Sequence, residues 1–279
     1  MVDYLQRAKF FRTKKRLGQN FLVNPDVIAD ILDYAQITKD DVVLEIGPGV
    51  GFVTEQLVKY AKKVIAVELD EEAVRELKKL DCDNLEIIHN DILKTDLSQL
   101  ANGEKLKVVA NIPYYITSPI IAHLLGEIND LNNKNRAVIE DIILMVQEEV
   151  ARRIVATEKS SAKQYGLLTI LSQFWADCSI IRLVGRRSFY PAPKVNSALV
   201  SLKVRKEPLL ELKDYDFFRK TTKAAFSQRR KTLKNCLLGA GFDKEKITSA
   251  IFELGLDENI RGEKLSILQL GELSELLAK

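Results

Sequence analysis

Short apolar runs rich in β-branched residues alternate with helix-like segments through the first part of this chain. The runs lie at 42–46, 64–67, 85–88 and 108–110. They are largely apolar, as is typical of parallel strands that are buried on both faces. Helical patterns separate them at 52–60, 71–80 and 117–125. Repeated strand–helix–strand units predict a doubly wound α/β sheet, whose ligands bind beyond the carboxyl ends of the strands.

The rest of the chain divides near residue 207. An earlier helix opens at Asn24-Pro25, where a capping side chain precedes a proline at the first helical position. Further strands are expected at 137–146, 180–184 and 197–204, the last two as a hairpin, with helices from about 147 and at 164–176. After Lys206-Glu207-Pro208 only helices are expected, at 215–226, 229–238, 243–253 and 266–277. The prediction is an α/β domain at 1–207 and a small all-helical domain at 208–279.

Composition excludes several classes of protein. The 279 residues are 46% hydrophobic and 29% charged, as in soluble globular proteins. Cys82, Cys178 and Cys236 match no disulfide or metal spacing, so we expect reduced thiols and a cytoplasmic protein. Because only two histidines are present, we expect no metal site. No apolar run is long enough to span a bilayer, so we expect no membrane association.

Basic residues are concentrated in two segments, although the net charge is only +3. The first is the N-terminal arm, with Arg7, Lys9, Arg12, Lys14, Lys15 and Arg16. The second, at 218–234, has seven basic residues and no acid, and it includes Arg229, Arg230 and Lys231. Aromatic residues lie near both segments. The pattern favours a nucleic-acid partner, with a solvated helix face as the alternative for either segment alone.

Three successive strand ends carry residues suited to a nucleoside cofactor. The first strand runs into a glycine turn with Gly47 and Gly49, where backbone amides can approach a ligand. Glu68 ends the second strand, where an acid can accept both hydroxyls of a ribose. Asp91 follows the third strand, where it can accept from an adenine amino group. A dinucleotide such as NAD would fit the first two features equally well.

The fourth strand favours methyl transfer instead, because it ends at Asn111-Ile112-Pro113-Tyr114. The lone pair of an adenine amine is delocalised into the ring. The Asn111 side-chain oxygen and the Ile112 carbonyl could accept the two amine hydrogens and favour a more tetrahedral nitrogen. Pro113 makes the turn rigid, and Tyr114 offers a ring on which the base can stack. The target base must be flipped out or single-stranded. S-Adenosylmethionine is therefore the predicted cofactor, and S-adenosylhomocysteine the product.

Together these motifs resemble those of a known family. They are Lys15-Arg16-Leu17-Gly18-Gln19-Asn20-Phe21-Leu22, the glycine turn, Glu68, Asp91, the Asn111–Tyr114 tetrapeptide, Met145-Val146-Gln147, Phe189-Tyr190-Pro191-Ala192-Pro193-Lys194-Val195 and Arg229-Arg230-Lys231-Thr232-Leu233. The chain resembles the ribosomal RNA adenine dimethyltransferases over almost its whole length. It is most similar to the branch that dimethylates two adjacent adenosines near the 3′ end of bacterial small-subunit (16S) rRNA.

The resemblance implies a Rossmann-like S-adenosylmethionine-dependent methyltransferase domain followed by a helical rRNA-binding domain. It implies that Asn20 and Leu22 contact the cofactor, as do Gly47, Glu68, Asp91 and Asn111. It also implies that Phe189 forms a second aromatic wall for the target adenine, although the residues alone equally favour a core aromatic. Tyr115 stands where many relatives have Asn, and we expect it to alter packing rather than chemistry. The expected partner is small-subunit rRNA within a pre-30S particle, bound by a monomer.

Three alternatives remain at this point. A sister branch dimethylates one adenosine of large-subunit (23S) rRNA and confers resistance to macrolide-type antibiotics, and the run from Ala225 to Asn235 favours the small-subunit branch over it. DNA adenine methyltransferases usually have two prolines in the catalytic turn, where this chain has Ile112 and Pro113. A ribosome-assembly factor in which methylation is secondary is a third alternative.

Overall fold

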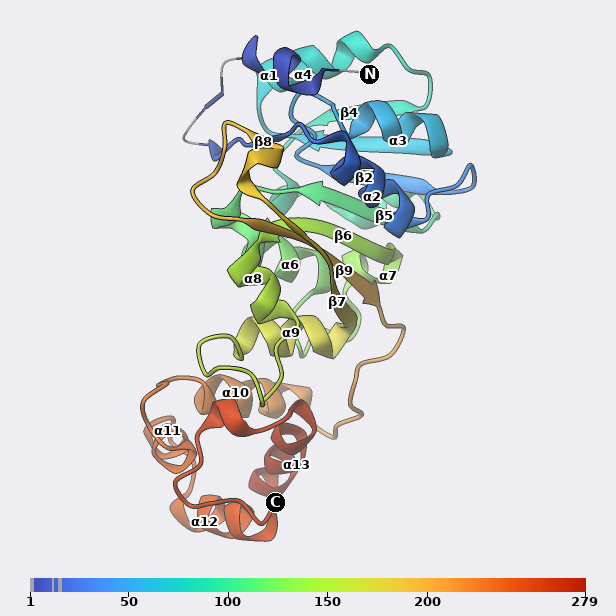
Figure 1. The fold of residues 1–279 in the computed structure, drawn as a ribbon. Coiled ribbons are helices and arrows are strands. Elements are labelled where there is room, and N and C mark those ends of the chain that lie inside the picture. The colour runs from blue at the N-terminus through green and yellow to red at the C-terminus, as the bar shows by residue number, and fades with distance from the viewer. Residues whose placement is uncertain (1–2, 12, 15–16) are drawn as a thin grey trace. The chain divides into compact units, whose positions relative to one another are not determined.

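The computed structural model describes residues 3–11, 13–14 and 17–279, which form two compact units (Figure 1). The first unit runs to Gly126 and also includes Asn132–Ala151 and Asp177–Val204. The second unit comprises Glu127–Leu131, Arg152–Ala176 and Arg205–Lys279. Its last segment begins close to the predicted boundary at 207, but two earlier segments of the chain belong to the same unit.

A seven-stranded sheet in the order β4-β3-β2-β5-β6-β9-β7 forms the centre of the first unit. The strands are β2 (Val42–Ile46), β3 (Lys63–Glu68), β4 (Leu85–His89), β5 (Leu106–Asn111), β6 (Ile139–Gln147), β7 (Ala176–Val184) and β9 (Ser197–Val204). The strands β2 to β6 pair in parallel, whereas β9 is antiparallel to β6. The predicted Rossmann-like α/β fold is therefore confirmed.

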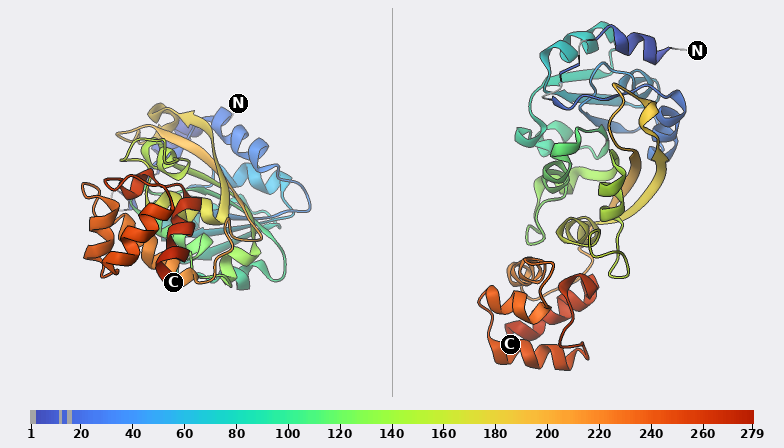
Figure 2. Two further views of the ribbon diagram at one scale, coloured as in Figure 1. Left: turned by 90° about the horizontal axis from the view of Figure 1, so that it is seen from below. Right: turned by 60° about the vertical axis from the view of Figure 1, so that its left-hand side comes forward.

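Helices cover both faces of this sheet (Figure 2). Those that precede or connect the strands are α1 (Tyr4–Lys9), α2 (Pro25–Ala35), α3 (Thr54–Tyr60), α4 (Glu71–Leu77), α5 (Leu97–Ala101), α6 (Thr117–Leu125), α7 (Lys134–Val138) and α8 (Glu148–Ile154). Short 3-10 turns also occur at Lys78–Leu80, Ile92–Lys94, Tyr114–Ile116 and Arg186–Ser188. As predicted, Asn24 caps α2, since its side-chain oxygen accepts from the Asp26 amide at 3.0 Å.

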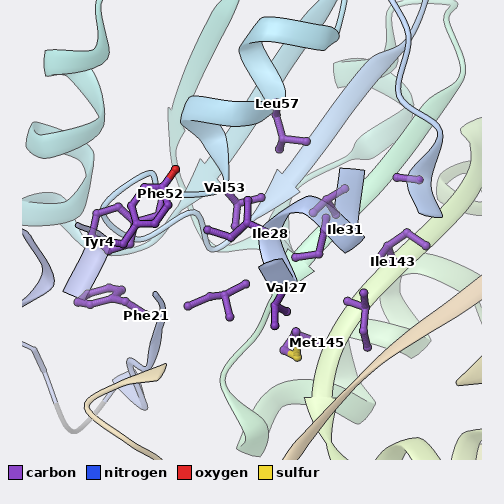
Figure 3. Close-up of a cluster of buried hydrophobic side chains, with 14 of the residues drawn as sticks. Tyr4, Phe21, Val27, Ile28, Ile31, Phe52, Val53, Leu57, Ile143 and Met145 are labelled. Atoms are coloured by element: carbon purple, nitrogen blue, oxygen red, sulfur yellow. The ribbon is translucent and has the colours of Figure 1, made fainter. Parts of the chain in front are cut away.

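One apolar core lies between α2, α3 and the sheet (Figure 3). Ile28 and Ile31 of α2 and Leu57 of α3 pack with Ile143 and Met145 of β6. The two β6 residues are two positions apart, so they project from the same face of the strand. The same cluster includes Phe21 from the short strand β1 (Phe21–Leu22), which ties the N-terminal segment to the domain.

The carboxyl ends of the four parallel strands β2 to β5 meet at one edge of the sheet. Ile46 at the end of β2 pairs with Val67 and with Ala110, one residue before Asn111. Glu68 pairs with His89, the last residue of β4. The residues that follow these strands are therefore brought together, as the sequence predicts.

The second unit contains the C-terminal helices, which are α10 (Tyr215–Ala225), α11 (Leu233–Gly239), α12 (Lys244–Glu253) and α13 (Ile267–Ala278), with a 3-10 turn at Gly262–Lys264. It also includes α9 (Leu167–Trp175). Phe174 of α9 packs against Phe218 of α10 with ring centroids 5.6 Å apart. This contact explains why α9 belongs to the second unit although it precedes the predicted boundary.

The structure corrects three predicted elements. The predicted helix at 229–238 begins only at Leu233, because the Thr232 side chain caps the Asn235 amide there. The predicted strand at 137–146 begins at Ile139, after the short helix α7. The predicted strand at 180–184 begins at Ala176; β7 and β9 are neighbours in the sheet, as the predicted hairpin requires, but the connection between them contains a two-residue strand, β8 (Phe189–Tyr190), which pairs with β1. Within the described ranges, no helix is long and apolar enough to cross a membrane.

Candidate active site

A cleft lies at the carboxyl edge of the sheet in the first unit. Ten of the residues predicted for the catalytic centre and the cofactor line it, namely Asn20, Leu22, Gly47, Gly49, Glu68, Asp91, Asn111, Ile112, Pro113 and Tyr114. They come from the segment around β1 and from the ends of β2, β3, β4 and β5. The fold therefore brings together residues that are far apart in the sequence, at the position where an open α/β sheet binds its ligand.

The glycine turn after β2 has a backbone that only glycine adopts without strain. Gly47 and Gly49 have φ angles of +66° and +58°. A Cβ atom at Gly49 would lie 2.8 Å from the Phe21 ring, so a side chain there would displace this ring. A Cβ atom at Gly47 would meet only the Asn111 carbonyl oxygen, at 3.9 Å. Gly47 therefore leaves open space beside Asn111, where a ligand can approach the backbone.

The carboxylate of Glu68 is buried at the end of β3. One oxygen accepts from the Gly49 amide at 2.9 Å, and the other accepts from the amides of Leu69 and Asp70 at 2.8 Å. Burial raises the pKa of Glu68, against the lowering effect of these backbone donors. The amides fix the carboxylate between the glycine turn and α4. Because two oxygens have about four acceptor positions, one remains for a ribose hydroxyl.

Asp91 lies in the loop after β4 and caps the 3-10 turn at Ile92–Lys94. One of its oxygens accepts from the Leu93 amide at 3.0 Å, which fixes the orientation of the side chain. The residue lines the cleft together with Asn90 and Ile92. An acid and an apolar side chain at this position suit the amino edge and the face of an adenine ring.

The side chain of Asn111 is oriented by the N-terminal segment. Its amide nitrogen donates to the backbone carbonyl of Asn20 at 3.0 Å. The Asn20 side chain in turn donates to the Gly18 carbonyl at 2.9 Å, which stabilises the turn that presents this carbonyl. Because the nitrogen of the Asn111 amide is engaged, its oxygen remains as an acceptor for a ligand.

The remainder of the tetrapeptide is held rigidly. Ile112 is buried, and the Pro113 carbonyl accepts from the Ile116 amide at 3.1 Å. The Tyr114 hydroxyl lies 2.7 Å from the Ser197 hydroxyl, and burial raises the pKa of Tyr114. Tyr115 is different, because 64% of its side chain is exposed at the mouth of the cleft. The tetrapeptide thus presents a fixed acceptor and a fixed aromatic ring.

A set of polar contacts that sequence reasoning missed ties the N-terminal segment to the cleft. Buried Asp70 accepts from Lys14 Nζ at 2.6 Å and from Gln19 Nε2 at 2.7 Å. Burial acts to raise the pKa of Asp70, but these donors lower it below its ordinary value. The amide of Asp70 also donates to Glu68. The only signal in the sequence is the position of Asp70, two residues after Glu68 and directly before a helix.

The cations of the predicted basic arm therefore do not all face solvent. Lys14 pairs with Asp70, and Arg7 pairs with Glu55 while lying 5.0 Å from the centre of the Phe52 ring. Arg12, Lys15 and Arg16 lie outside the described residues. At least two of the six predicted cations thus stabilise the domain itself.

Glu45 is a second residue that sequence reasoning missed. It lies on β2, lines the cleft and is 3% exposed. Burial raises its pKa to about 8, and the neighbouring Glu68 adds to this effect, whereas a hydrogen bond from Thr54 at 2.6 Å opposes it. Within an apolar strand Glu45 gives no signal of its own, apart from its position two residues before Gly47.

Phe189 is not among the described residues that line the cleft. Phe189 is 3% exposed and packs in the core with Phe21, as the alternative reading of its motif predicts. Arg229, Arg230 and Lys231 are exposed in the turn between α10 and α11 of the second unit. The role of Phe189 as an aromatic wall and the RNA-binding role of the three cations stay predictions.

The charges of the cleft fit a cationic cofactor. Glu68 and Asp91 line it, and no lysine or arginine is among the described lining residues. S-Adenosylmethionine carries a sulfonium and an ammonium group, whereas the pyrophosphate of a dinucleotide is anionic. The open space at Gly47 and the buried acceptor at Glu68 suit an adenosine, which both kinds of cofactor contain, so it is the charges that favour S-adenosylmethionine. Across the described residues, no group of three or more histidines, cysteines and acids has an arrangement that could hold a metal ion.

Comparisons with known proteins agree with this geometry. A family model described as "Ribosomal RNA adenine dimethylase" matches residues 10–279. The "Ribosomal RNA small subunit methyltransferase A" of Clostridium acetobutylicum is 43% identical over 270 residues, which is 95% of this chain and 94% of the relative. The protein of the same name from Clostridioides difficile is 42% identical over 274 residues, 96% and 91% of the two chains.

Two solved structures have the same fold over most of the chain. A dimethyladenosine transferase from Plasmodium falciparum superposes with a TM-score of 0.73 at 29% identity, covering 90% of this chain and 94% of that one. The 23S rRNA methyltransferase ErmE superposes with a TM-score of 0.70 at 28% identity, covering 93% of this chain and 100% of that one. The overall fold is therefore shared with a dimethyladenosine transferase and with a 23S rRNA methyltransferase.

Proposed function

The chain belongs to the family of ribosomal RNA adenine dimethylases, and we propose that it methylates N6 of two adjacent adenosines near the 3′ end of small-subunit (16S) rRNA. The product is N6,N6-dimethyladenosine. The observation that carries this proposal is the oriented amide of Asn111 at the end of an acid-lined cleft. The small-subunit assignment rests on the names of relatives that match nearly the whole chain.

The cofactor of the proposed reaction is S-adenosylmethionine. When bound, it supplies a methyl group on a positively charged sulfur and leaves as S-adenosylhomocysteine. Glu68 would accept from a ribose hydroxyl, and Asp91 would accept from the adenine amino group. Backbone amides of the glycine turn would approach the remainder of the cofactor from the end of β2.

The residues of the chain act mainly by orienting the target amine. The Asn111 oxygen and the Ile112 carbonyl each accept one amine hydrogen, which favours a nitrogen whose lone pair is available for attack. Tyr114 stacks on the base and fixes its plane. The ammonium product is acidic enough to lose its proton to water, so no general base is needed. Catalysis thus depends on proximity and orientation.

The second methylation places an additional demand on this site. After the first transfer the amine has one hydrogen left, so only one of the two acceptors can still be satisfied. The methyl group then has to occupy the position that the first hydrogen left. Two cofactor molecules are consumed for each base, and the cleft has to exchange its ligand between the two transfers.

The proposed partner is small-subunit rRNA within a pre-30S particle, bound by a monomer in the cytoplasm, where ribosomes are assembled. We propose that the helical segment 208–279 supplies the rRNA-binding domain through the exposed turn that contains Arg229, Arg230 and Lys231. An independent role in subunit assembly, with methylation secondary, is the second candidate function. It is favoured by this exposed basic turn, because binding to a particle does not require the catalytic cleft.

Replacement of Asn111 by Ala tests the catalytic assignment. We expect methyl transfer to fall by at least about a hundredfold, as is typical when an oriented polar group is removed from a catalytic centre, while binding to the small subunit is retained. Transfer is measured with a labelled methyl group and by mass spectrometry of the rRNA. Asn259→Ala, at an exposed position of the second unit, is the control. Unchanged methylation by Asn111→Ala would refute the assignment.

The choice of substrate is tested with the wild-type protein. Small-subunit particles, large-subunit particles and naked duplex DNA are each incubated with the protein and the labelled cofactor. We expect label in small-subunit rRNA, on two adjacent adenosines. Label only in large-subunit rRNA would favour the sister branch, and label only in the duplex would favour a DNA methyltransferase.

A further inference from the structure

Ser197 contacts the catalytic tetrapeptide, although it belongs to none of the motifs described above. It is the first residue of β9 and is fully buried. Its hydroxyl lies 2.7 Å from the hydroxyl of Tyr114, a hydrogen bond between residues 83 positions apart in the chain. Ser197 is not part of the described lining of the cleft, so its contact with the site is through the tyrosine.

The position of Ser197 is set by the same strand that sets Asn111. On one side of β6, Met145 pairs with Asn111. On the other side, Gln147 pairs with Ser197. The Glu148 amide also donates to the Asn196 carbonyl at 3.0 Å, which extends this pairing by one residue. Strand β6, which lies between β5 and β9 in Figure 1, therefore fixes both the amide acceptor and the partner of the aromatic ring.

This arrangement restricts the motion of the Tyr114 ring. A tyrosine ring can rotate about its Cβ–Cγ bond and swing about its Cα–Cβ bond. A hydrogen bond at the far end of the ring opposes the swing, because the partner is on a paired strand. A buried hydroxyl without a partner costs free energy, so the bonded position is strongly preferred. Stacking on a base needs such a fixed plane, since the attacking nitrogen has to be aligned with the methyl group.

We propose that Ser197 is a positioning residue that holds the Tyr114 ring in the plane in which the target adenine stacks. It does not touch the substrate and acts only through the tyrosine. The proposal rests on the proposed function to the extent that Tyr114 is the stacking ring. It also links the proline-flanked motif that begins at Phe189 to the catalytic turn, because Ser197 lies two residues after the end of this motif at Val195.

A double-mutant cycle tests the proposal. The variants are Ser197→Ala, Tyr114→Phe and the two combined, which remove one hydroxyl, the other, or both. For each single variant we expect kcat/KM for the RNA to fall about tenfold, as expected for the loss of one hydrogen bond in the transition state. The double variant should lose no more than either single one, because the same contact is removed in all three.

Three further measurements separate positioning from a structural role. Ser197→Thr keeps the hydroxyl and should restore most of the activity. The Kd of S-adenosylmethionine, measured by calorimetry, should stay within about twofold of wild type in all variants, since the cofactor residues are unchanged. Ser201→Ala, at another buried serine of β9, is the matched control and should keep wild-type kcat/KM.

The outcomes are distinct. Losses that multiply in the double variant, or wild-type activity of Ser197→Ala, would overturn the proposal. A variant that fails to fold is identified from its melting temperature, and the Thr variant then decides, because it preserves the contact. The cycle uses whichever adenine substrate the wild-type protein methylates. A failure of the small-subunit assignment would therefore change the substrate of the assay but not its logic.

Discussion

Replacement of Glu45 by Gln should change how the stability of the protein depends on pH. Burial raises the pKa of this carboxyl from its ordinary value of 4.5 to about 8, so the folded protein holds it protonated at neutral pH. In the unfolded chain the same group is ionised above pH 4.5. The raised pKa therefore contributes a stability that is fully present below about pH 4.5 and is lost as the pH rises through about 8.

The magnitude follows from the two pKa values. Each pH unit between them corresponds to about 1.4 kcal/mol, so the whole difference corresponds to about 5 kcal/mol at most. Gln has the same shape and does not ionise, and the Thr54 hydroxyl can still donate to its oxygen. The free energy of unfolding of wild type should consequently fall between pH 5 and pH 8 relative to that of Glu45→Gln.

Denaturant unfolding of the cofactor-free protein at pH 5, 6, 7 and 8 measures this difference. Glu253→Gln, at an exposed position of α12, is the control and should run parallel to wild type at every pH. If Glu45→Gln also runs parallel to wild type, Glu45 is not held protonated and the reasoning from its burial is wrong.

Two further predictions concern the glycine turn and the exposed basic turn. Gly49→Ala should lower the melting temperature and weaken S-adenosylmethionine binding measured by calorimetry, because its Cβ would lie 2.8 Å from the Phe21 ring. Gly103→Ala is the control, because Gly103 also has a positive φ but a Cβ atom there would have no neighbour within 4 Å. An equal fall in melting temperature for Gly103→Ala would show that backbone strain alone explains the effect of Gly49→Ala. Removal of Arg229, Arg230 and Lys231 together should weaken binding to the small subunit and reduce the dependence of log K on log salt concentration by about three. An unchanged salt slope would show that these residues contact no phosphate.

The strands and the strand-end residues could be predicted from sequence because each depends on local pattern. The apolar run at 42–46 coincides with β2, and Glu68 and Asn111 end their strands as expected. A parallel sheet brings such ends together whatever the details of packing. For the same reason the predicted cofactor residues line one cleft.

What could not be predicted depends on contacts between distant segments. The pairing of β8 with β1 and the contact of Ser197 with Tyr114 are set by tertiary register, which leaves no local signal. Lys14 looks like part of a surface cluster until the fold places Asp70 beside it. Phe189 shows the converse, because a motif position alone does not tell whether an aromatic ring lines a cleft or fills the core.

The acidic lining of the cleft also bears on turnover. Methyl transfer consumes the sulfonium charge, so the spent cofactor carries one positive charge fewer than the fresh one. The cleft contains Glu68 and Asp91, and no lysine or arginine is among its described lining residues. It therefore attracts S-adenosylmethionine more strongly than S-adenosylhomocysteine. Dimethylation of each base requires two such exchanges of ligand. The carboxyls that we propose to bind the cofactor thus also give the enzyme an electrostatic bias against inhibition by its own product.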